Sequence, residues 1–338
     1  MTMAHPNSPQ ANAVRSTTQT EPHHRVIDRS ELRIRDPYIV EYDDRYLLFG
    51  TTDPSPWHGP GVGFDRYESD DLEHWRGPFP AFRPGAGFWG ETQFWAPEVH
   101  SYNGAWWMFA TFADRAGRRG TQVLTATTPD GLFQPWSDGP VTPSEWMCLD
   151  GTLFQDPSGA PWLIFCHEWL QAGDGAIYAQ RLSDDLRTSS GAPILLFTAS
   201  QAPWTRAFRN DETGYDDLAF ITDGPFVVHD DAGLALLWSS GGEGGYSVGV
   251  ARSSTGLITG PWVHQQHPVV EAGGGHAMLL TARDERLLVF HQPNELSFER
   301  LTIARVAETD GIYRIPAAHA GDSNETEDPG TGNGGGPR

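Results

Sequence analysis

Short runs of β-branched and aromatic residues alternate with clusters of Gly, Pro, Asp and Asn along most of the chain. The clusters recur at intervals of roughly 8–12 residues, and almost no segment keeps the period of an amphipathic helix. This pattern is typical of an all-β protein built from short strands. We therefore expect one all-β domain at residues 28–316. Disordered tails are expected at residues 1–27 and 317–338, which are polar or Gly-rich and lack any period.

The chain also contains an internal repeat. The first unit has a predicted strand at 33–40, a polar turn at 41–45, a strand at 46–52 and another strand near 67–75. The same order returns in units that open near residues 94, 148, 221 and 275. Four-stranded sheets repeated around an axis are the blades of a β-propeller. The sequence therefore predicts an all-β, five-bladed β-propeller; a β-sandwich would explain the strands but not their repetition.

Charge and composition limit the ligand. The formal net charge is −21 at pH 7, and such a field repels nucleic acid and anionic lipid, so a neutral ligand is expected. All 23 basic residues are Arg, because the chain contains no Lys. This excludes Schiff-base chemistry and a P-loop that needs its lysine.

Cysteine content and hydropathy bear on the compartment. Cys148 and Cys166 are predicted to be two buried free thiols, with a single disulfide as the alternative. The N-terminal stretch has no apolar core of signal-peptide length, and no apolar run is long enough to span a bilayer. We expect a cytoplasmic protein without membrane contact.

Acidic residues recur at the start of the predicted inner strands. Asp36, Asp150, Asp223 and His276 occupy the same place in units one, three, four and five, and Ala96 lies near it in unit two. In a propeller these strands line the central channel, so their ends converge; the plain alternative is that Asp-Pro and Asp-Gly are ordinary turn pairs. Crowded carboxylates acquire different pKa values, as a base and an acid working together require. Carboxyls about 6.5–9.5 Å apart are typical of inverting glycosidases.

An ordered set of motifs carries a family resemblance. The motifs are Arg35-Asp36-Pro37-Tyr38-Ile39, Trp95-Ala96-Pro97-Glu98, Leu149-Asp150-Gly151-Thr152-Leu153-Phe154, Asp223-Gly224-Pro225-Phe226, Gly274-Gly275-His276-Ala277-Met278 and Glu299-Arg300. Together they resemble glycoside hydrolase family 43 over residues 32–315. The resemblance implies a five-bladed propeller that acts on arabinose- or xylose-containing glycans, mostly with inversion. It also implies that Asp36 is the general base and that Asp150 tunes the pKa of the acid.

The sequence leaves three alternatives open for the general acid. The family usually has Glu-Gly-Pro where this chain has Asp223-Gly224-Pro225. Aspartate is one methylene shorter, and a misplacement of about 1 Å can cost about 10²-fold in rate. Glu168, at the end of the third unit's second strand, can supply the missing length. If neither residue is the acid, hydrolysis is altered or lost.

Further residues are candidates for binding. The resemblance implies that His276 helps to hold calcium or another ion in the channel, mostly through water, and that Arg300 reaches the sugar; no cofactor is otherwise required. Calcium prefers oxygen ligands, so a structural His276 is the alternative. Aromatic rings stack on the C–H faces of a pentose. The aromatic candidates in or beside the predicted mouth loops are Phe94, Trp95 and Trp169, followed by Trp57, Trp89 and Trp204.

These observations lead to a functional hypothesis with two alternatives. The chain is expected to hydrolyse a neutral oligosaccharide or polysaccharide, as an α-L-arabinofuranosidase, a β-xylosidase or an arabinanase. One alternative is a carbohydrate-binding propeller without catalysis. The other is a related propeller glycosidase that acts on a galactose- or fructose-type sugar.

Overall fold

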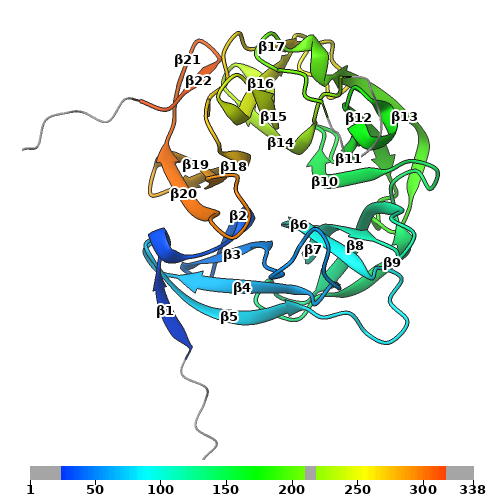
Figure 1. Cartoon of the computed structure of the whole chain (residues 1–338), viewed down its shortest axis with the longest axis vertical. Coiled ribbons are helices and arrows are strands. Elements are labelled where there is room, and N and C mark those ends of the chain that lie inside the picture. The colour runs from blue at the N-terminus through cyan, green and yellow to red at the C-terminus, as the bar shows by residue number, and fades with distance from the viewer. Residues whose placement is uncertain (1–23, 210–217, 317–338) are drawn as a thin grey trace, which may run out of the picture.

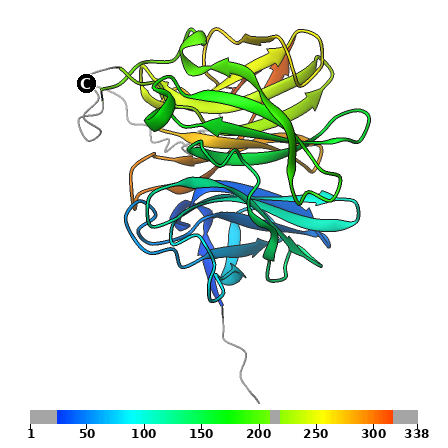
Figure 2. The same cartoon turned by 90° about the vertical axis from the view of Figure 1, so that its right-hand side faces the viewer.

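The computed structural model describes residues 24–209 and 218–316. Five antiparallel sheets stand around a common axis in chain order (Figure 1). The arrangement is the five-bladed β-propeller that the repeat predicts, and the fold prediction is confirmed. Viewed from the side, the blades are twisted sheets that pack face to face (Figure 2).

Within each blade the strands follow one another outward from the axis. The first blade contains β2 (Arg35–Tyr42), β3 (Arg45–Thr51), β4 (Phe64–Ser69) and β5 (His74–Phe82). The second contains β6 (Thr92–Tyr102), β7 (Ala105–Ala113), β8 (Arg119–Ala126) and β9 (Gln134–Pro140). The third contains β10 (Cys148–Gln155), β11 (Pro161–His167), β12 (Ala176–Leu182) and β13 (Ser189–Thr198). The fourth contains β14 (Asp223–Asp230), β15 (Gly233–Gly242), β16 (Gly245–Ser253) and β17 (Trp262–His264). The fifth contains β18 (Gly275–Ala282), β19 (Glu285–Gln292) and β20 (Arg300–Arg305).

Short elements complete the described part of the chain. The hairpin of β21 (Ala307–Thr309) and β22 (Ile312–Arg314) follows the fifth blade. The helices are η1 (Arg29–Glu31), α1 (Trp169–Ala172) and η2 (Ala199–Gln201). Among the described residues, none of the helices has the length and apolar character needed to cross a membrane.

The strand β1 (Arg25–Asp28) corrects the predicted start of the domain. It pairs antiparallel with β5, with Ile27 opposite Trp75, and adds a fifth strand to the outer edge of the first blade. The predicted N-terminal tail ends at residue 27, so three of its residues belong to this strand. The strand is short and largely exposed, so no alternation of apolar residues marks it in the sequence. The rest of that predicted tail up to residue 23, and the predicted tail at 317–338, lie outside the described residues.

Hydrophobic clusters fill the space between neighbouring blades. The largest joins the first, second and fifth blades, and others lie between the second and third, third and fourth, and fourth and fifth. Sheets covered on both faces bury consecutive residues, which explains the unbroken apolar run Leu163–Cys166 in β11. Cys148 and Cys166 are buried free thiols, as predicted.

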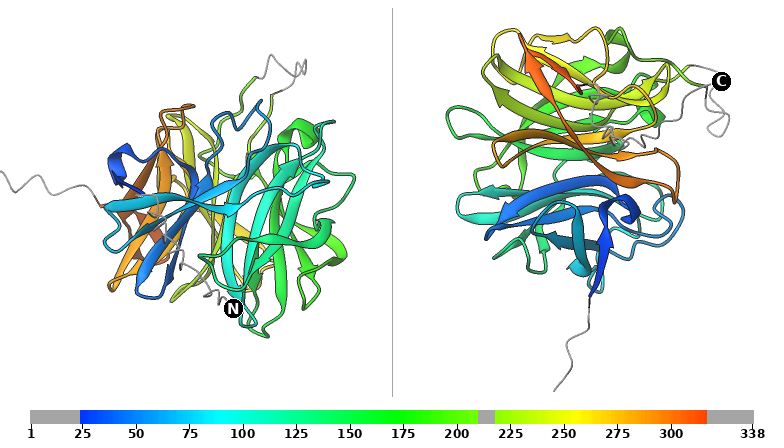
Figure 3. Two further views of the ribbon diagram at one scale, coloured as in Figure 1. Left: turned by 90° about the horizontal axis from the view of Figure 1, so that it is seen from below. Right: turned by 90° about the vertical axis from the view of Figure 1, so that its left-hand side faces the viewer.

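The fifth blade meets the first and closes the ring (Figure 3). The backbone N–H of Leu301 donates to the carbonyl oxygen of Leu32 at 3.3 Å, and the backbones of Arg33 and Arg300 form an antiparallel β-bridge. The N–H of Ile39 on β2 donates to the sulfur of Met278 on β18 at 3.0 Å. Residues that are far apart in the sequence thus become neighbours at this junction.

Each innermost strand contains a bulge near its start. The strand register shifts after Arg35, Trp95, Leu149, Asp223 and Gly275. The next residue in every blade has a left-handed backbone: φ is 51° at Asp36, 47° at Ala96, 53° at Asp150, 51° at Gly224 and 52° at His276. Such φ values are uncommon for residues other than glycine. Their recurrence shows that these five positions are structurally equivalent.

The equivalence of the five bulge positions corrects the predicted place of Asp223. The position in the fourth blade that corresponds to Asp36, Asp150 and His276 is Gly224, not Asp223. A Cβ atom at Gly224 would lie 2.8 Å from Cγ of His276, so no larger residue fits there. The acidic residue of this blade therefore lies one position before the bulge.

A side chain of the preceding blade accepts the N–H group of the bulge at every junction, and at four of the five this side chain is on the second strand. Oγ1 of Thr51 accepts from Ala96 at 2.8 Å, Oγ1 of Thr111 from Asp150 at 2.9 Å, Oγ of Ser239 from His276 at 2.8 Å and Nδ1 of His291 from Asp36 at 3.2 Å. All these acceptors are buried, and a buried N–H without a partner is costly. The bonds therefore hold the bulges and tie each blade to the next.

The variant Thr111→Val tests the contribution of these bonds. Valine keeps the shape of the fully buried threonine but removes the acceptor for the N–H of Asp150. We expect the free energy of unfolding to fall by about 1–3 kcal/mol, because a buried donor loses its partner. Denaturant unfolding measures the change, with Thr281→Val at an exposed position of β18 as the control. Equal unfolding free energies in the two variants would contradict this role.

Candidate active site

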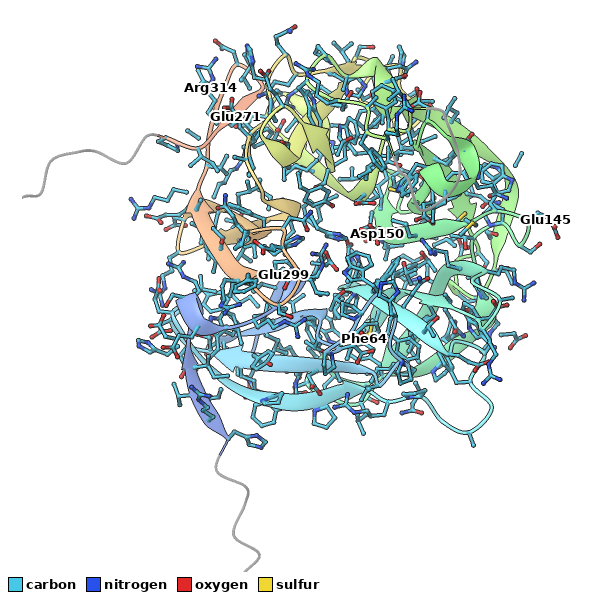
Figure 4. The ribbon with its side chains drawn as sticks, viewed as in Figure 1. Phe64, Glu145, Asp150, Glu271, Glu299 and Arg314 are labelled. Atoms are coloured by element: carbon cyan, nitrogen blue, oxygen red, sulfur yellow. The ribbon has the colours of Figure 1, made fainter. Side chains whose placement is uncertain are left out.

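A cavity of about 570 Å³ opens where the five bulges meet. Its lining comes from all five blades and includes Asp36, Gln93, Asp150, Glu168, Asp223 and His276. Asp150 lies near the centre of the ring of blades when the molecule is seen down its axis (Figure 4). The side chains predicted to carry the chemistry therefore share one site.

Asp36, Asp150 and His276 converge on one point. Nδ1 of His276 lies 3.4 Å from Oδ1 of Asp36 and 3.7 Å from Oδ2 of Asp150. All three side chains are buried. Burial disfavours a charged imidazole, but the carboxylates of Asp36 and Asp150 outweigh this effect and raise the pKa of His276. The histidine is therefore a positive group between two acids.

Asp36 is held in its ionised form. Burial raises the pKa of a carboxyl group, but His276, Arg35 and the other neighbours of Asp36 outweigh burial and lower its pKa. The hydroxyl of Thr51 donates to Oδ2 of Asp36 at 2.6 Å, which also favours the carboxylate. An ionised, oriented carboxylate is suited to accept a proton.

His291 supports Asp36 as a neutral ring. Burial and then the nearby Arg35 lower the pKa of His291 to about 3. Its Nδ1 accepts the N–H of Asp36, so the ring proton is on Nε2, which donates to Oδ1 of Asn294 at 3.1 Å. The 3.7 Å approach of His291 to the Asp36 carboxylate is therefore not an ion pair.

Asp150 and Asp223 have the opposite tendency. Burial is the main cause that raises the pKa of each, and the charge of Asp223 raises the pKa of Asp150 further. Oδ2 of Asp150 accepts the N–H of Gly224 at 3.0 Å. Oδ2 of Asp223 accepts the hydroxyl of Tyr246 at 2.9 Å. Two neighbouring carboxyls that disfavour joint ionisation can retain a proton near neutral pH.

Tyr246 fixes the position of the Asp223 carboxyl. It lies on β16, and its ring stacks on His291 with centroids 5.9 Å apart. A Cβ atom at Gly275 would lie 1.9 Å from this ring, so the glycine allows the close approach. Tyr246 therefore sits between the fourth and fifth blades with its hydroxyl directed at Asp223.

Glu168 lies in the same cavity but has a different partner. It precedes α1 and forms a buried ion pair with Arg119, whose guanidinium lies 4.9 Å from the ring centroid of Trp95. Burial raises the pKa of Glu168 to about 7, although Arg119 opposes the shift. The Arg119–Glu168 ion pair lines one side of the cavity.

Tryptophan rings and arginine guanidinium groups contact one another along the side of the cavity that contains Arg119. Trp57 meets Trp95 edge to face, with ring centroids 4.9 Å apart, and Arg35 lies 5.0 Å from the ring centroid of Trp57. Nε1 of Trp95 donates to the carbonyl oxygen of Pro56 at 2.7 Å. Trp169 also lines the cavity. Planar rings beside strong hydrogen-bond donors are suited to a neutral sugar.

The structure contradicts the predicted role of Phe94 in substrate binding. Phe94 is buried in the core of the first two blades, with its ring centroid 4.8 Å from that of Phe112. Side chains alternate along a strand, so Gln93 and Trp95 face the cavity while Phe94 points away. Among the secondary candidates, Trp57 lines the cavity, whereas Trp204 is a core residue and Trp89 is half-buried outside it.

Arg300, which the resemblance places at the sugar, does not line the cavity in this structure. Its guanidinium donates to the carbonyl oxygens of Ser297 and Glu299. Arg300 pairs with Arg33 in a β-bridge at the junction of the fifth and first blades, and this position keeps its side chain out of the cavity. Arg35 enters the cavity instead, held by Glu299 at 3.1 Å and Asn294 at 2.8 Å.

The expected ion at His276 has a limited fit to these residues. Nδ1 of His276 faces the carboxyls of Asp36 and Asp150, which favour a proton on this nitrogen over a metal ion. Within residues 24–209 and 218–316, no three His, Cys, Asp or Glu side chains are grouped as direct metal ligands. Contact through water, as the resemblance implies, stays a prediction, and the mechanism below does not depend on it.

Several cavity residues are not among the predicted site residues, and Arg35, Tyr246 and Asn294 are the ones that contact the acids or their partners. Arg35 precedes the bulge that contains Asp36, which is a local signal for cavity placement. Tyr246 follows the Gly-rich turn 241–245, where a single polar aromatic residue opens a strand. Asn294 lies in the loop after β19 and has no local signal.

Comparison with known proteins places these features in context. Residues 30–311 match the model of Glycosyl hydrolases family 43. The structure of an endo-arabinase from Bacteroides thetaiotaomicron VPI-5482 is 38% identical, with a TM-score of 0.77, over 84% of this chain and 98% of that one. A thermostable family-43 glycoside hydrolase is 25% identical, with a TM-score of 0.69, over 90% and 96% of the two chains.

A curated relative is longer than this chain. Alpha-L-arabinofuranosidase 43 of Humicola insolens is 23% identical over 289 residues, which make up 77% of this chain and 54% of the relative. This chain therefore spans about half the length of that protein.

Proposed function

The chain belongs to glycosyl hydrolase family 43, and from this premise we propose that it hydrolyses arabinose- or xylose-containing glycans with inversion at the anomeric carbon. One observation carries the proposal: three carboxyls, of which Asp36 and Asp150 are buried and Asp223 is half-buried, share a cavity, and their pKa values are shifted in opposite directions. A base must be ionised and an acid protonated at the same pH, and this division meets both needs.

Asp36 is the general base in this mechanism. Its lowered pKa keeps it ionised near neutral pH. It takes a proton from a water molecule as the water oxygen attacks the anomeric carbon. The new C–O bond forms on the face opposite the bond that breaks, so the product has the inverted anomeric configuration.

Asp223 is the general acid. Its raised pKa favours the protonated form, and this proton passes to the glycosidic oxygen as the C–O bond breaks. The leaving sugar then departs as a neutral alcohol. The hydroxyl of Tyr246 stabilises the carboxylate that remains. Glu168 also has a raised pKa, of about 7, but its carboxylate is already paired with Arg119 and would have to leave that partner to protonate the glycosidic oxygen.

Asp150 orients the site between base and acid. It contacts His276 on one side and accepts the N–H of Gly224 on the other. Since the charge of Asp223 raises the pKa of Asp150, the pair holds a proton more readily than either carboxyl alone. The coupling is mutual, so an ionised Asp150 in turn disfavours ionisation of Asp223.

The side chains around the carboxyls support a neutral pentose as substrate. Trp57, Trp95 and Trp169 offer apolar faces, while Arg35 and the Arg119–Glu168 pair offer hydrogen bonds to hydroxyls. The names of two relatives, an endo-arabinase and an α-L-arabinofuranosidase, favour arabinofuranosyl linkages over xylosyl ones.

Hydrolysis itself is the first test. We expect turnover of aryl α-L-arabinofuranoside or arabinan, with the inverted anomer as the first product in NMR spectra. Asp36→Asn should lower kcat by about 10²–10⁴-fold, because the base is lost. Asp138→Asn, at a fully exposed carboxylate, is the control and should leave kcat unchanged. Binding of sugars without turnover would support the carbohydrate-binding alternative, and a retained anomer would contradict the mechanism.

Leaving-group dependence identifies the acid. Asp223→Asn should reduce hydrolysis of arabinan strongly and that of an activated aryl glycoside much less, because a good leaving group needs little protonation. Glu168→Gln should affect both substrates to a similar extent through weaker binding. The reverse pattern would assign the acid role to Glu168.

The pH profile of Tyr246→Phe gives an independent check on the acid. The hydroxyl of Tyr246 favours the carboxylate form of Asp223, so its removal should raise the pKa of Asp223 further. An acid with a higher pKa stays protonated to higher pH. The alkaline limb of kcat/KM should therefore move upward, while the acidic limb, set by Asp36, stays in place. An unmoved alkaline limb would contradict Asp223 as the acid.

A further inference from the structure

Four of the five blade junctions share a hydrogen bond that the junction of the third and fourth blades lacks. In each blade, one residue on the second strand pairs with the residue just before the bulge. These residues are Thr51, Thr111, Cys166, Ser239 and His291. Four of them accept the N–H of the bulge in the next blade. Cys166, at the junction of the third and fourth blades, is the exception.

The bulge N–H of the fourth blade has a different acceptor. Gly224 donates to Oδ2 of Asp150 at 3.0 Å, and not to the sulfur of Cys166. Cys166 is fully buried, and burial raises the pKa of its thiol well above the ordinary value, so the group is a neutral thiol. A neutral thiol is a weak acceptor, whereas a carboxylate is a strong one.

We propose that Cys166 is a positioning residue for Asp150: because it does not accept the N–H of Gly224, that donor remains available to the Asp150 carboxylate. The inference rests on the proposed function, in which Asp150 orients the acid and the base. The bond holds the Asp150 carboxyl toward His276, and it favours the ionised form of a group whose pKa burial raises.

The other junctions show what a hydroxyl would do at this place. Ser239 occupies the equivalent position in the fourth blade, and its Oγ accepts the N–H of His276 at 2.8 Å. A serine at position 166 is therefore within reach of the N–H of Gly224 and would compete with Asp150 for it. Asp150 would then lose a charge-assisted hydrogen bond.

The variants Cys166→Ser and Cys166→Ala separate this role from packing. Alanine removes the thiol without adding an acceptor, so Asp150 keeps its bond to Gly224. We expect kcat on arabinan to fall about tenfold or more in Cys166→Ser, with KM little changed, and to stay within about threefold of the wild type in Cys166→Ala. The thermal midpoint should have the opposite order, with Cys166→Ser at least as stable as Cys166→Ala.

Opposite orders of activity and stability are not expected from a purely structural residue. If both variants lose activity in proportion to stability, or if Cys166→Ser keeps the kcat of Cys166→Ala, the proposal is wrong. A crystal structure of Cys166→Ser provides a readout independent of turnover. The distance from the nitrogen of Gly224 to Oδ2 of Asp150 should lengthen, with the serine oxygen as the new acceptor. If the wild-type protein hydrolyses no glycoside, the proposed function fails, and the crystal structure still tests the exchange of acceptors.

Discussion

The structure depends on one backbone feature, the left-handed bulge at the start of each innermost strand. Four of the five bulge residues are not glycine, and such conformations cost of order 1–3 kcal/mol each unless the surroundings impose them. Here the preceding blade supplies an acceptor for the N–H group of the bulge at all five junctions. The same bonds that join the blades therefore direct Asp36, Asp150 and His276 toward the axis.

The convergence of these side chains creates an electrostatic problem. Buried carboxylates repel one another and lose their hydration, so a site with three of them needs positive partners or retained protons. Asp36 has His276 and Arg35 close by and is ionised, whereas Asp150 and Asp223 lie where burial dominates. The division of roles between base and acid thus follows from the unequal distribution of positive charge.

The side of the cavity is built differently from its acidic centre. Arginine and tryptophan side chains contact one another in the order Arg35, Trp57, Trp95 and Arg119, and Glu168 pairs with the last of them. These contacts come from the first three blades and keep the long guanidinium side chains in fixed positions. A rigid set of donors beside apolar faces is consistent with selection of a neutral, hydroxyl-rich ligand.

The sequence by itself determined the repeat, the five blades and the presence of acids at the strand starts, because each unit repeats the same local alternation and turn residues. It also located Glu168 near the site through its place after a predicted strand. Only the tertiary structure decided that Gly224 rather than Asp223 occupies the bulge, that Phe94 is core, and that Arg35 replaces Arg300. A bulge moves the set of residues that face the axis along the strand by one position. The junction that closes the ring joins residues at opposite ends of the domain. Contacts of this kind are set by packing between blades and leave no local pattern in the chain.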